Sequence, residues 1–421
     1  MKKSLLAVAA MGAFASVAQA QSSVTVYGIL DVGYTGANTR ASTNTTTEKA
    51  TASRIGNSME SGSRIGFRGN EDLGGGTAAV FTFELGLQPA GNAGSNGGTT
   101  GTAASTAATA GSSYNASANV WAPDVRQAFV GFEKKGLGNV RVGIQNTLFW
   151  EQAGVNTTGQ LAQTLGSMLA PTSVGAFYSN SNFLTTNSTT ANALSAYTSR
   201  TSNTIRFATD RMAGLVAKAA YTQSNSDINQ GAAASGNGYT GGNNNQTGYQ
   251  LALDYVIQKA NIQGSYASFK SENPFATGTP LNVTPIGWGT GTQGTNVTDN
   301  QALITASYDF GILKAYAGWT DRKQTSVVNG NAFIKRTAQE IGVRSFITPA
   351  IEAWGSVGNG RYTSYGTSSP TANITGYQLG SNYYVSKRTN LYAIYGANNT
   401  SSTTLGAAGA NQYSVGVRHT F

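Results

Sequence analysis

The chain has 421 residues and no cysteine, and charged residues make up only 11% of it while hydrophobic residues make up 39%. The lack of cysteine excludes a disulfide framework, thiol catalysis and a thiolate metal site. The formal net charge is +9, but the basic residues are dispersed along the chain without a long Lys/Arg run, which argues against nucleic acid as a partner. Such a chain is too polar for a large dry core and too poor in charge for ordinary disorder. A β-barrel with an apolar outer face and a wet interior has this balance, because only one face of each strand needs to be apolar.

Residues 1–20 have the organisation of a secretory signal peptide. Lys2 and Lys3 precede an apolar run that extends to Val17, and small residues follow up to Ala20. A transmembrane anchor needs about twenty apolar residues, so this run is too short. We expect cleavage after Ala20, which leaves a single barrel domain over 21–421 with a net charge of 9 − 2 = +7.

Period-two alternation starts at residues 24–34 and recurs along the chain, which is the pattern of half-buried β-strands. In TGYQLALDYVIQ, Leu251 and Leu253 fall on one face, and Gln250 and Asp254 fall on the other. A soluble sandwich would turn the polar face outward to water, whereas a membrane barrel would turn it inward to water. The period alone does not separate these two folds.

The connections between the strands do separate them. Seven short turns alternate with eight long polar loops, and together they join sixteen strands. The short turns are 71–76, 134–139, 210–214, 257–261, 309–313, 348–350 and 386–390, and the long loops are 37–60, 89–121, 148–200, 224–246, 271–298, 325–333, 364–372 and 400–410. This asymmetry is typical of transmembrane barrels. We therefore predict an all-β fold, a sixteen-stranded antiparallel transmembrane β-barrel with short periplasmic turns and long extracellular loops.

The last residues, NQYSVGVRHTF, alternate to the end of the chain. Tyr413 and Phe421 belong to the apolar face, and small or polar residues form the other face. A closed barrel must pair its last strand with its first, because open edges are prohibitive in lipid. We expect this strand to close the barrel and Phe421 to lie in the periplasmic-side aromatic girdle.

Alternation also indicates which charged residues face the lumen. The apolar neighbours of Arg64 and Arg68 must face lipid, so these arginines face inward. With Phe129 taken as outward, Arg126 faces inward, and the alternation around Arg206 gives it the same direction. Most single charges on this face are ordinary solvated lumen residues, and this broader set comprises Arg141, Lys218, Lys314, Arg344, Arg418, Asp31, Glu84, Asp254, Asp309, Glu340 and Glu352.

Six stretches in order along the chain resemble the Gram-negative porins, most closely those of the beta-proteobacteria. They are SSVTVYGILDVG, SGSRIGFRGNEDLGGG, RQAFVGFEKKGLGNVRVG, SNTIRF, NYYVSKRTNLYAIYG and QYSVGVRHTF. The resemblance implies an outer-membrane homotrimer that lets small hydrophilic solutes and ions diffuse passively. It also implies contact with outer-membrane lipids and lipopolysaccharide, and recognition of the Phe421 strand by the outer-membrane assembly machinery.

The resemblance further implies a constriction, where a third loop over about 148–198 folds into the barrel. Arg64, Arg68 and Arg126 match the basic cluster that similar porins place there. The chain departs from the usual pattern in the loop, where Glu151 is the one candidate counter-charge, and at Ile144, where many relatives carry arginine. The first departure favours anions and the second removes one basic group, so the sequence predicts a channel that prefers small anions.

Catalysis and metal binding have little support. The single histidine, His419, is predicted to face outward, and without a second histidine or a cysteine there is no Ser-His pair or zinc site. We expect no enzyme activity, no cofactor and no metal. Two alternatives stay open: a substrate-selective channel for organic anions or saccharides, and a secreted all-β adhesin without a pore.

Overall fold

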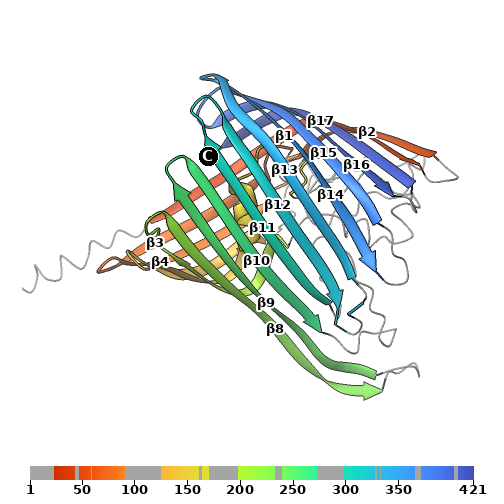
Figure 1. Ribbon diagram of the computed structural model, residues 1–421. Coiled ribbons are helices and arrows are strands. Elements are labelled where there is room, and N and C mark those ends of the chain that lie inside the picture. Colours follow the sequence, from red (N-terminus) through yellow and green to blue (C-terminus); the bar gives the residue numbers. More distant parts are fainter. Residues whose placement is uncertain are drawn as a thin grey trace, which may run out of the picture.

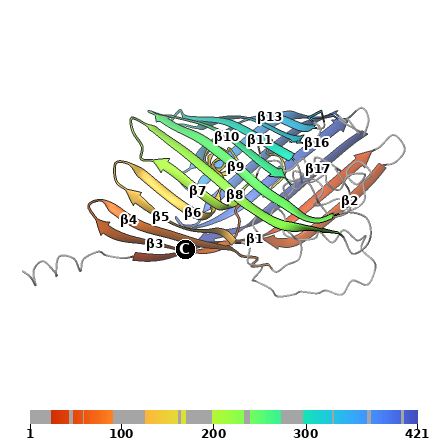
Figure 2. The same cartoon turned by 90° about the horizontal axis from the view of Figure 1, so that it is seen from below.

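The computed structural model describes residues 23–42, 47–57, 59–90, 125–160, 164–169, 198–232, 239–272, 297–327, 330–331, 333–365, 371–402 and 406–421. Long tilted strands form a barrel, and the short helix α2 (Leu148–Val155) lies within the ring of strands (Figures 1 and 2). Among these residues, no helix is long and apolar enough to cross a membrane.

One sheet of seventeen strands forms the wall. The strands are β1 (Ser23–Ser42), β2 (Thr47–Asn57), β3 (Arg64–Gly74), β4 (Thr77–Gly86), β5 (Val125–Lys134), β6 (Gly138–Asn146), β7 (Arg200–Thr209), β8 (Leu215–Ala232), β9 (Tyr239–Ile257), β10 (Ala260–Glu272), β11 (Val297–Asp309), β12 (Lys314–Ser326), β13 (Phe333–Thr348), β14 (Ile351–Tyr365), β15 (Thr371–Tyr384), β16 (Thr389–Ser402) and β17 (Gly406–Thr420).

The seventeen strands fill sixteen positions in the barrel, because β2 and β3 share one. β2 pairs with the second half of β1, over 32–42, and β3 pairs with its first half, over 23–29. β1 also pairs with β17 from Ile29 opposite Thr420 to Ser42 opposite Ala407, which closes the ring. The predicted sixteen-stranded antiparallel barrel is therefore confirmed, with one position interrupted between Asn57 and Arg64.

The last residue, Phe421, takes part in closing the barrel. The Phe421 amide donates to the Gly28 carbonyl at 3.1 Å, and the Gly28 amide donates to the Phe421 carbonyl at 3.0 Å. A Cβ at Gly28 would lie 2.3 Å from Cζ of Phe421, so the phenylalanine ring lies directly against the glycine. Tyr413 faces outward with its ring centre 6.2 Å from that of Tyr34, across the same pair of strands.

In most strands, side chains point to the inner or outer surface as the alternation predicts. On β9, Leu251 and Leu253 are more than half exposed on the outer surface, whereas Gln250 and Asp254 are buried inside. An isolated sheet with this pattern would show its apolar face to water. In a membrane the same face contacts acyl chains, which removes that penalty.

Phe129 is an exception, and its expected outward direction is wrong. It is buried, and the exposed neighbours Val130 and Phe132 take the outer face. The guanidinium of Arg141 lies 5.1 Å from the centre of the Phe129 ring. The phenylalanine therefore packs on the inner side of β5, beside an inward arginine.

Two of the expected long loops are largely strand. β1 and β2 extend to Ser42 and from Thr47, and β8 and β9 extend to Ala232 and from Tyr239, so most of 37–60 and 224–246 forms ladders. Figure 1 shows the β8–β9 hairpin projecting beyond its neighbours. A β-ladder is held by backbone groups, so polar side chains on both faces are compatible with it outside the membrane. The loop expected over 89–121 lies almost entirely outside the described residues.

Because Leu253 faces lipid, a charged side chain at this position should strongly destabilise the barrel. Leu253 lies between the outward residues Tyr249 and Tyr255, so Leu253→Arg should lower the free energy of unfolding by about 2–4 kcal/mol. Leu253→Ala should cost less than Leu253→Arg, because it loses only the transfer of part of one apolar side chain from water to lipid and leaves no cavity. Leu303 faces inward, fully buried in a cluster with Phe149, so Leu303→Ala should cost about 2–5 kcal/mol. Urea titration in lipid vesicles, followed by tryptophan fluorescence, measures all three, and similar results for the two Leu253 variants would contradict the assignment.

Candidate pore constriction

Among the arginines that lie against carboxylates on the inner wall, four share one arrangement. Arg126 approaches Glu84 at 2.6 Å and Arg64 approaches the same residue at 3.8 Å. Arg418 lies 3.3 Å from Glu60, and Arg344 lies 3.6 Å from Glu352. These side chains come from β3, β4, β5, β13, β14 and β17 and from the segment between β2 and β3. We call this set the arginine wall.

In each of these pairs the arginine is the partner that meets water. The four arginine side chains are 16–28% exposed, whereas those of Glu84, Glu60 and Glu352 are 3–5% exposed. Other donors also hold the carboxylates, since Tyr27 donates to Glu84, Asn382 and Asn390 to Glu60, and Tyr384 to Glu352. A solute in the lumen therefore encounters the guanidinium groups before the carboxylates.

Arg126 reaches the lumen through a β-bulge. In the β4–β5 ladder, Glu84 pairs with Gln127 but Leu85 pairs with Val125, so Arg126 is the extra residue. A bulge leaves one residue unpaired and redirects its side chain. The inward direction predicted for Arg126 is therefore found, although Phe129, from which it was inferred, faces the opposite way.

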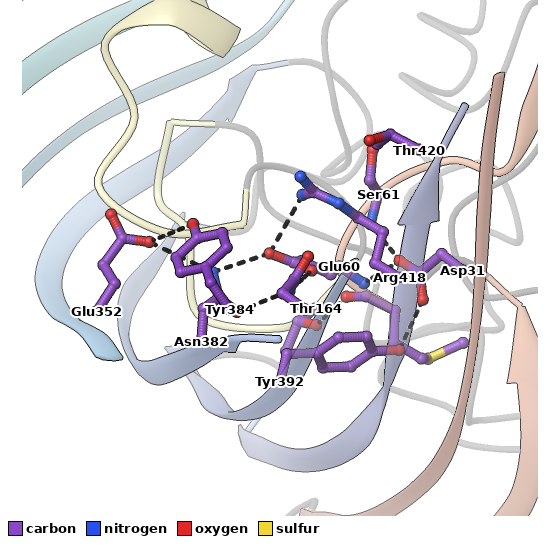
Figure 3. A network of polar contacts seen from close by, with 12 residues as sticks. Asp31, Glu60, Ser61, Thr164, Glu352, Asn382, Tyr384, Tyr392, Arg418 and Thr420 are labelled. Carbon is purple, nitrogen blue, oxygen red and sulfur yellow. Dashed lines mark hydrogen bonds and ion pairs between the residues drawn. The ribbon is translucent and has the colours of Figure 1, made fainter. Parts of the chain in front are cut away.

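The break between β2 and β3 positions Glu60. Both the Glu60 and Ser61 amides donate to Oδ2 of Asp31, at 2.9 and 2.6 Å, and the Tyr392 hydroxyl donates to Oδ1 at 2.7 Å. Figure 3 shows Arg418 and Asn382 on either side of Glu60, with Tyr392 reaching Asp31. Asp31 is fully buried and acts as a structural anchor. Glu60 was not predicted as a site residue, because it lies at the end of a stretch that the sequence assigned to a loop.

The same break orients Arg64. Its guanidinium donates to the Gly62 carbonyl at 2.9 Å and to the Ser61 hydroxyl at 3.0 Å. Arg68 lies on the same face of β3, four residues nearer the short turn, and its guanidinium is 5.5 Å from the centre of the Tyr27 ring. The structure therefore groups Arg64 with Arg126 at Glu84, and it places the exposed Arg68 beside this group.

Glu151 and Arg206, both predicted site residues, are partners of each other. Arg206 binds the Glu151 carboxylate through two hydrogen bonds of 2.5 and 2.7 Å, and Lys218 lies 3.9 Å from it. The side chain of Arg206 is 7% exposed and that of Glu151 is 27% exposed. Here the carboxylate is the better exposed partner, on the inner side of β7 and β8. Arg206 is neutralised, and it contributes little free positive charge to the lumen.

Helix α2 carries Glu151 and is fixed to the wall at both ends. The Thr147 hydroxyl caps its N-terminus by accepting from the Trp150 amide at 3.1 Å. Gln152 donates to Asp254 at 2.5 Å, and Asn156 donates to Thr305 at 3.3 Å. The helix side chain Phe149 also packs with the inward Leu303. This segment follows β6 and lies at the start of the loop predicted over about 148–198.

A second part of the same loop, residues 164–169, attaches to the wall through buried polar side chains. Glu340 accepts from the Ser167 hydroxyl at 3.0 Å and from the Met168 amide at 2.6 Å. Gln378 donates to the Thr164 and Leu165 carbonyls at 2.9 and 2.8 Å. The remaining anchors are Gln412, which accepts from the Leu165 amide at 3.2 Å, and Arg336, which donates to the Met168 carbonyl.

These loop anchors were not predicted as site residues. Gln378 and Gln412 were visible in the sequence only as polar members of alternating strands. Glu340 was predicted to face inward, but as an ordinary solvated residue, whereas it is 4% exposed. A glutamine in the middle of a strand is a weak signal, because solvated lumen residues have the same pattern.

A closed barrel of this size, with a polar interior and an internal loop beside charged residues, defines a membrane channel. Residues 7–403 match the family model of the Gram-negative porin, so the chain belongs to this family.

Curated relatives and solved structures agree with the family. An outer membrane porin protein of Bordetella pertussis is 27% identical over the full length of both chains. Outer membrane porin protein 32 of Delftia acidovorans is 46% identical over 20% of this chain and 22% of its own. The anion-selective porin from Comamonas acidovorans superposes with a TM-score of 0.59 at 19% identity, covering 95% of this chain and 100% of that one. The trimer form of OmpT from Vibrio cholerae gives a TM-score of 0.56 at 13% identity, over 95% and 99%. The protein is an outer-membrane channel for passive diffusion and not an enzyme.

Proposed function

We propose that the channel is a general diffusion pore for small hydrophilic solutes that prefers anions, and that it works as a homotrimer. The observation that carries the proposal is the arginine wall, in which guanidinium groups face the lumen and their carboxylates are buried behind them. Rings of positive side chains favour anions in a narrow pore.

Salt should weaken this preference, because it screens the charges that line the lumen. The screening length is about 8 Å at physiological ionic strength, so charges within a narrow constriction act across it while those in wide vestibules are screened. The Glu151 carboxylate is also partly exposed, and Arg206 and Lys218 offset its charge. We expect anion preference that weakens as salt rises.

Two of the solved structures support the proposal. The Comamonas acidovorans protein is described as anion-selective, and the OmpT structure is a trimer form. At 19% and 13% identity, these two structures share their fold with this chain.

Solute flux into liposomes tests the proposed function. The purified protein is reconstituted, and the influx of a monoanion, a neutral solute and a monocation of equal size is compared. A general pore gives rates that rise linearly with concentration in the order anion, neutral, cation. Saturation by one solute would favour the substrate-selective channel, and influx equal to that of empty liposomes would favour the adhesin.

We also propose that the signal peptide is removed after Ala20. We further propose that the outer-membrane assembly machinery recognises the last strand. Deleting Phe421, or Phe421→Asp, should lower the amount of folded trimer in cells, because closure at Gly28 and recognition both use this residue. Phe421→Tyr keeps the ring and should assemble normally. Gel mobility of unheated membranes measures the trimer, and normal assembly of the deletion variant would contradict the proposed role.

A further inference from the structure

The outer surface of the barrel carries a pair of like charges on β12 and β13. Lys323 and Lys335 are direct partners in the ladder. Their neighbours Arg322 and Arg336 are buried inside, so alternation turns both lysines outward. Like charges directly opposite on one face of a sheet are destabilising. An anion bound at this surface would offset the repulsion between the two lysines.

The counter-charges nearby do not balance the cations. Lys335 lies 2.9 Å from Asp321, whereas Lys323 lies over the ring of Phe333, 4.4 Å from its centre. Arg361 on β14 faces outward and is exposed, opposite Thr337 in the ladder. Within the described part of the chain, neither Lys323 nor Arg361 forms an ion pair with a carboxylate. We call Lys323, Lys335 and Arg361 the outer basic patch.

The residues around the patch fit an amphiphilic ligand. Asn300 and Thr363 lie beside the lysines in the ladder and add hydrogen-bonding groups. Toward the short turns, the outer surface becomes apolar, with Ile304, Ile341 and Val357 each more than half exposed and Trp319 40% exposed. The surface therefore offers positive charge on one side and contact for acyl chains on the other.

The patch lies at the long-loop end of the barrel. β12 and β13 are joined there, and the short turns 310–313 and 349–350 lie at the opposite ends of these strands. In outer-membrane barrels the long loops are extracellular. The patch therefore meets the outer leaflet of the membrane, where the anionic amphiphile is lipopolysaccharide.

We propose that the outer basic patch binds the phosphate groups of lipopolysaccharide directly, without a bridging divalent cation. Ammonium and guanidinium groups make strong charge-assisted hydrogen bonds to phosphate. A bound phosphate would also relieve the repulsion between Lys323 and Lys335. This proposal rests on the proposed function only through the orientation of the channel in the outer membrane.

The test compares two triple variants of the mature protein in neutral phosphatidylcholine nanodiscs with EDTA present. The first, Lys323→Gln/Lys335→Gln/Arg361→Gln, removes the patch. The control, Lys135→Gln/Lys387→Gln/Arg388→Gln, removes three exposed positive charges at the short turns. The probes are bisphosphorylated lipid A and the same lipid A after removal of its phosphates, and the dissociation constant of each is measured.

We expect the unmodified protein and the control to bind the phosphorylated lipid A at least about tenfold more tightly than the dephosphorylated form, because charge-assisted bonds are lost with the phosphates. The patch variant should bind both forms equally. No preference for phosphate in the unmodified protein, an unchanged preference in the patch variant, or binding that appears only when Mg²⁺ replaces EDTA would overturn the proposal. Dissociation of a trimer in the patch variant would instead assign the surface to a second copy of the chain.

Ion selectivity of the same variants, measured in planar bilayers, separates this proposal from the proposed function. The patch lies outside the barrel, so its removal should leave the zero-current potential unchanged. Loss of lipid A binding with unchanged selectivity supports the lipid site alone. If the unmodified protein shows no anion preference, the proposed function is contradicted. Tighter binding of phosphorylated lipid A would still support the lipid site.

Discussion

Replacing Arg64, Arg344 and Arg418 together with glutamine should turn the channel from anion preference to cation preference. The three substitutions remove the water-facing guanidinium groups but leave the buried Glu84, Glu60 and Glu352 behind them. Arg126 is kept, so that Glu84 retains one cation through the short bond, while Asn382 and Asn390 still donate to Glu60 and Tyr384 still donates to Glu352. The sign of the zero-current potential in a planar bilayer measures the change.

The lysine version of the same triple variant is the matched control. Arg64→Lys/Arg344→Lys/Arg418→Lys keeps the charge but loses the planar guanidinium, so it should stay anion-preferring. If the lysine and glutamine variants shift equally, geometry rather than charge controls the preference. If the glutamine variant keeps its anion preference, the arginine wall is not the selectivity element.

Releasing residues 164–169 from the wall should widen the channel. In the variant Glu340→Ala/Gln378→Ala, the Met168 amide and the Thr164 and Leu165 carbonyls lose their partners. Each buried polar group without a partner costs about 1–3 kcal/mol, so the docked position of the segment becomes less favourable. We expect a higher and noisier single-channel conductance, and faster influx of solutes that the unmodified channel excludes.

Gln263→Ala provides the control for the loop variant. Gln263 is an inward, buried glutamine of β10, and the hydrogen bonds described above for residues 164–169 go to Glu340, Gln378, Gln412 and Arg336 and not to it. Its replacement should leave the conductance close to that of the unmodified channel. Equal conductance in the control and in the Glu340→Ala/Gln378→Ala variant would show that these two anchors do not set the width.

The fold follows from the sequence to a large extent, because a membrane barrel repeats one simple rule. Each strand must show lipid an apolar face, and the alternation of residues such as Leu251 and Leu253 with Gln250 and Asp254 expresses that rule directly. The closing role of the last strand follows from the same requirement, since an open edge in lipid leaves backbone groups without partners.

The site depends on features that the alternation does not contain. A bulge turns Arg126 inward, and a break between strands brings Glu60 under Arg418. Both are irregularities of the backbone, and a period-two pattern assumes that there are none. The pairing of Glu151 with Arg206 depends on where helix α2 docks against β8 to β11, so no local pattern in the sequence could reveal it.

The zero-current potential of the unmodified channel across a fivefold KCl gradient tests the central claim most directly. The arginine wall predicts a potential with the sign of chloride preference, which decreases as both salt concentrations are raised at a constant ratio, because screening shortens the reach of the arginines. A potential with the sign of potassium preference, or one of zero at low salt, would contradict the account.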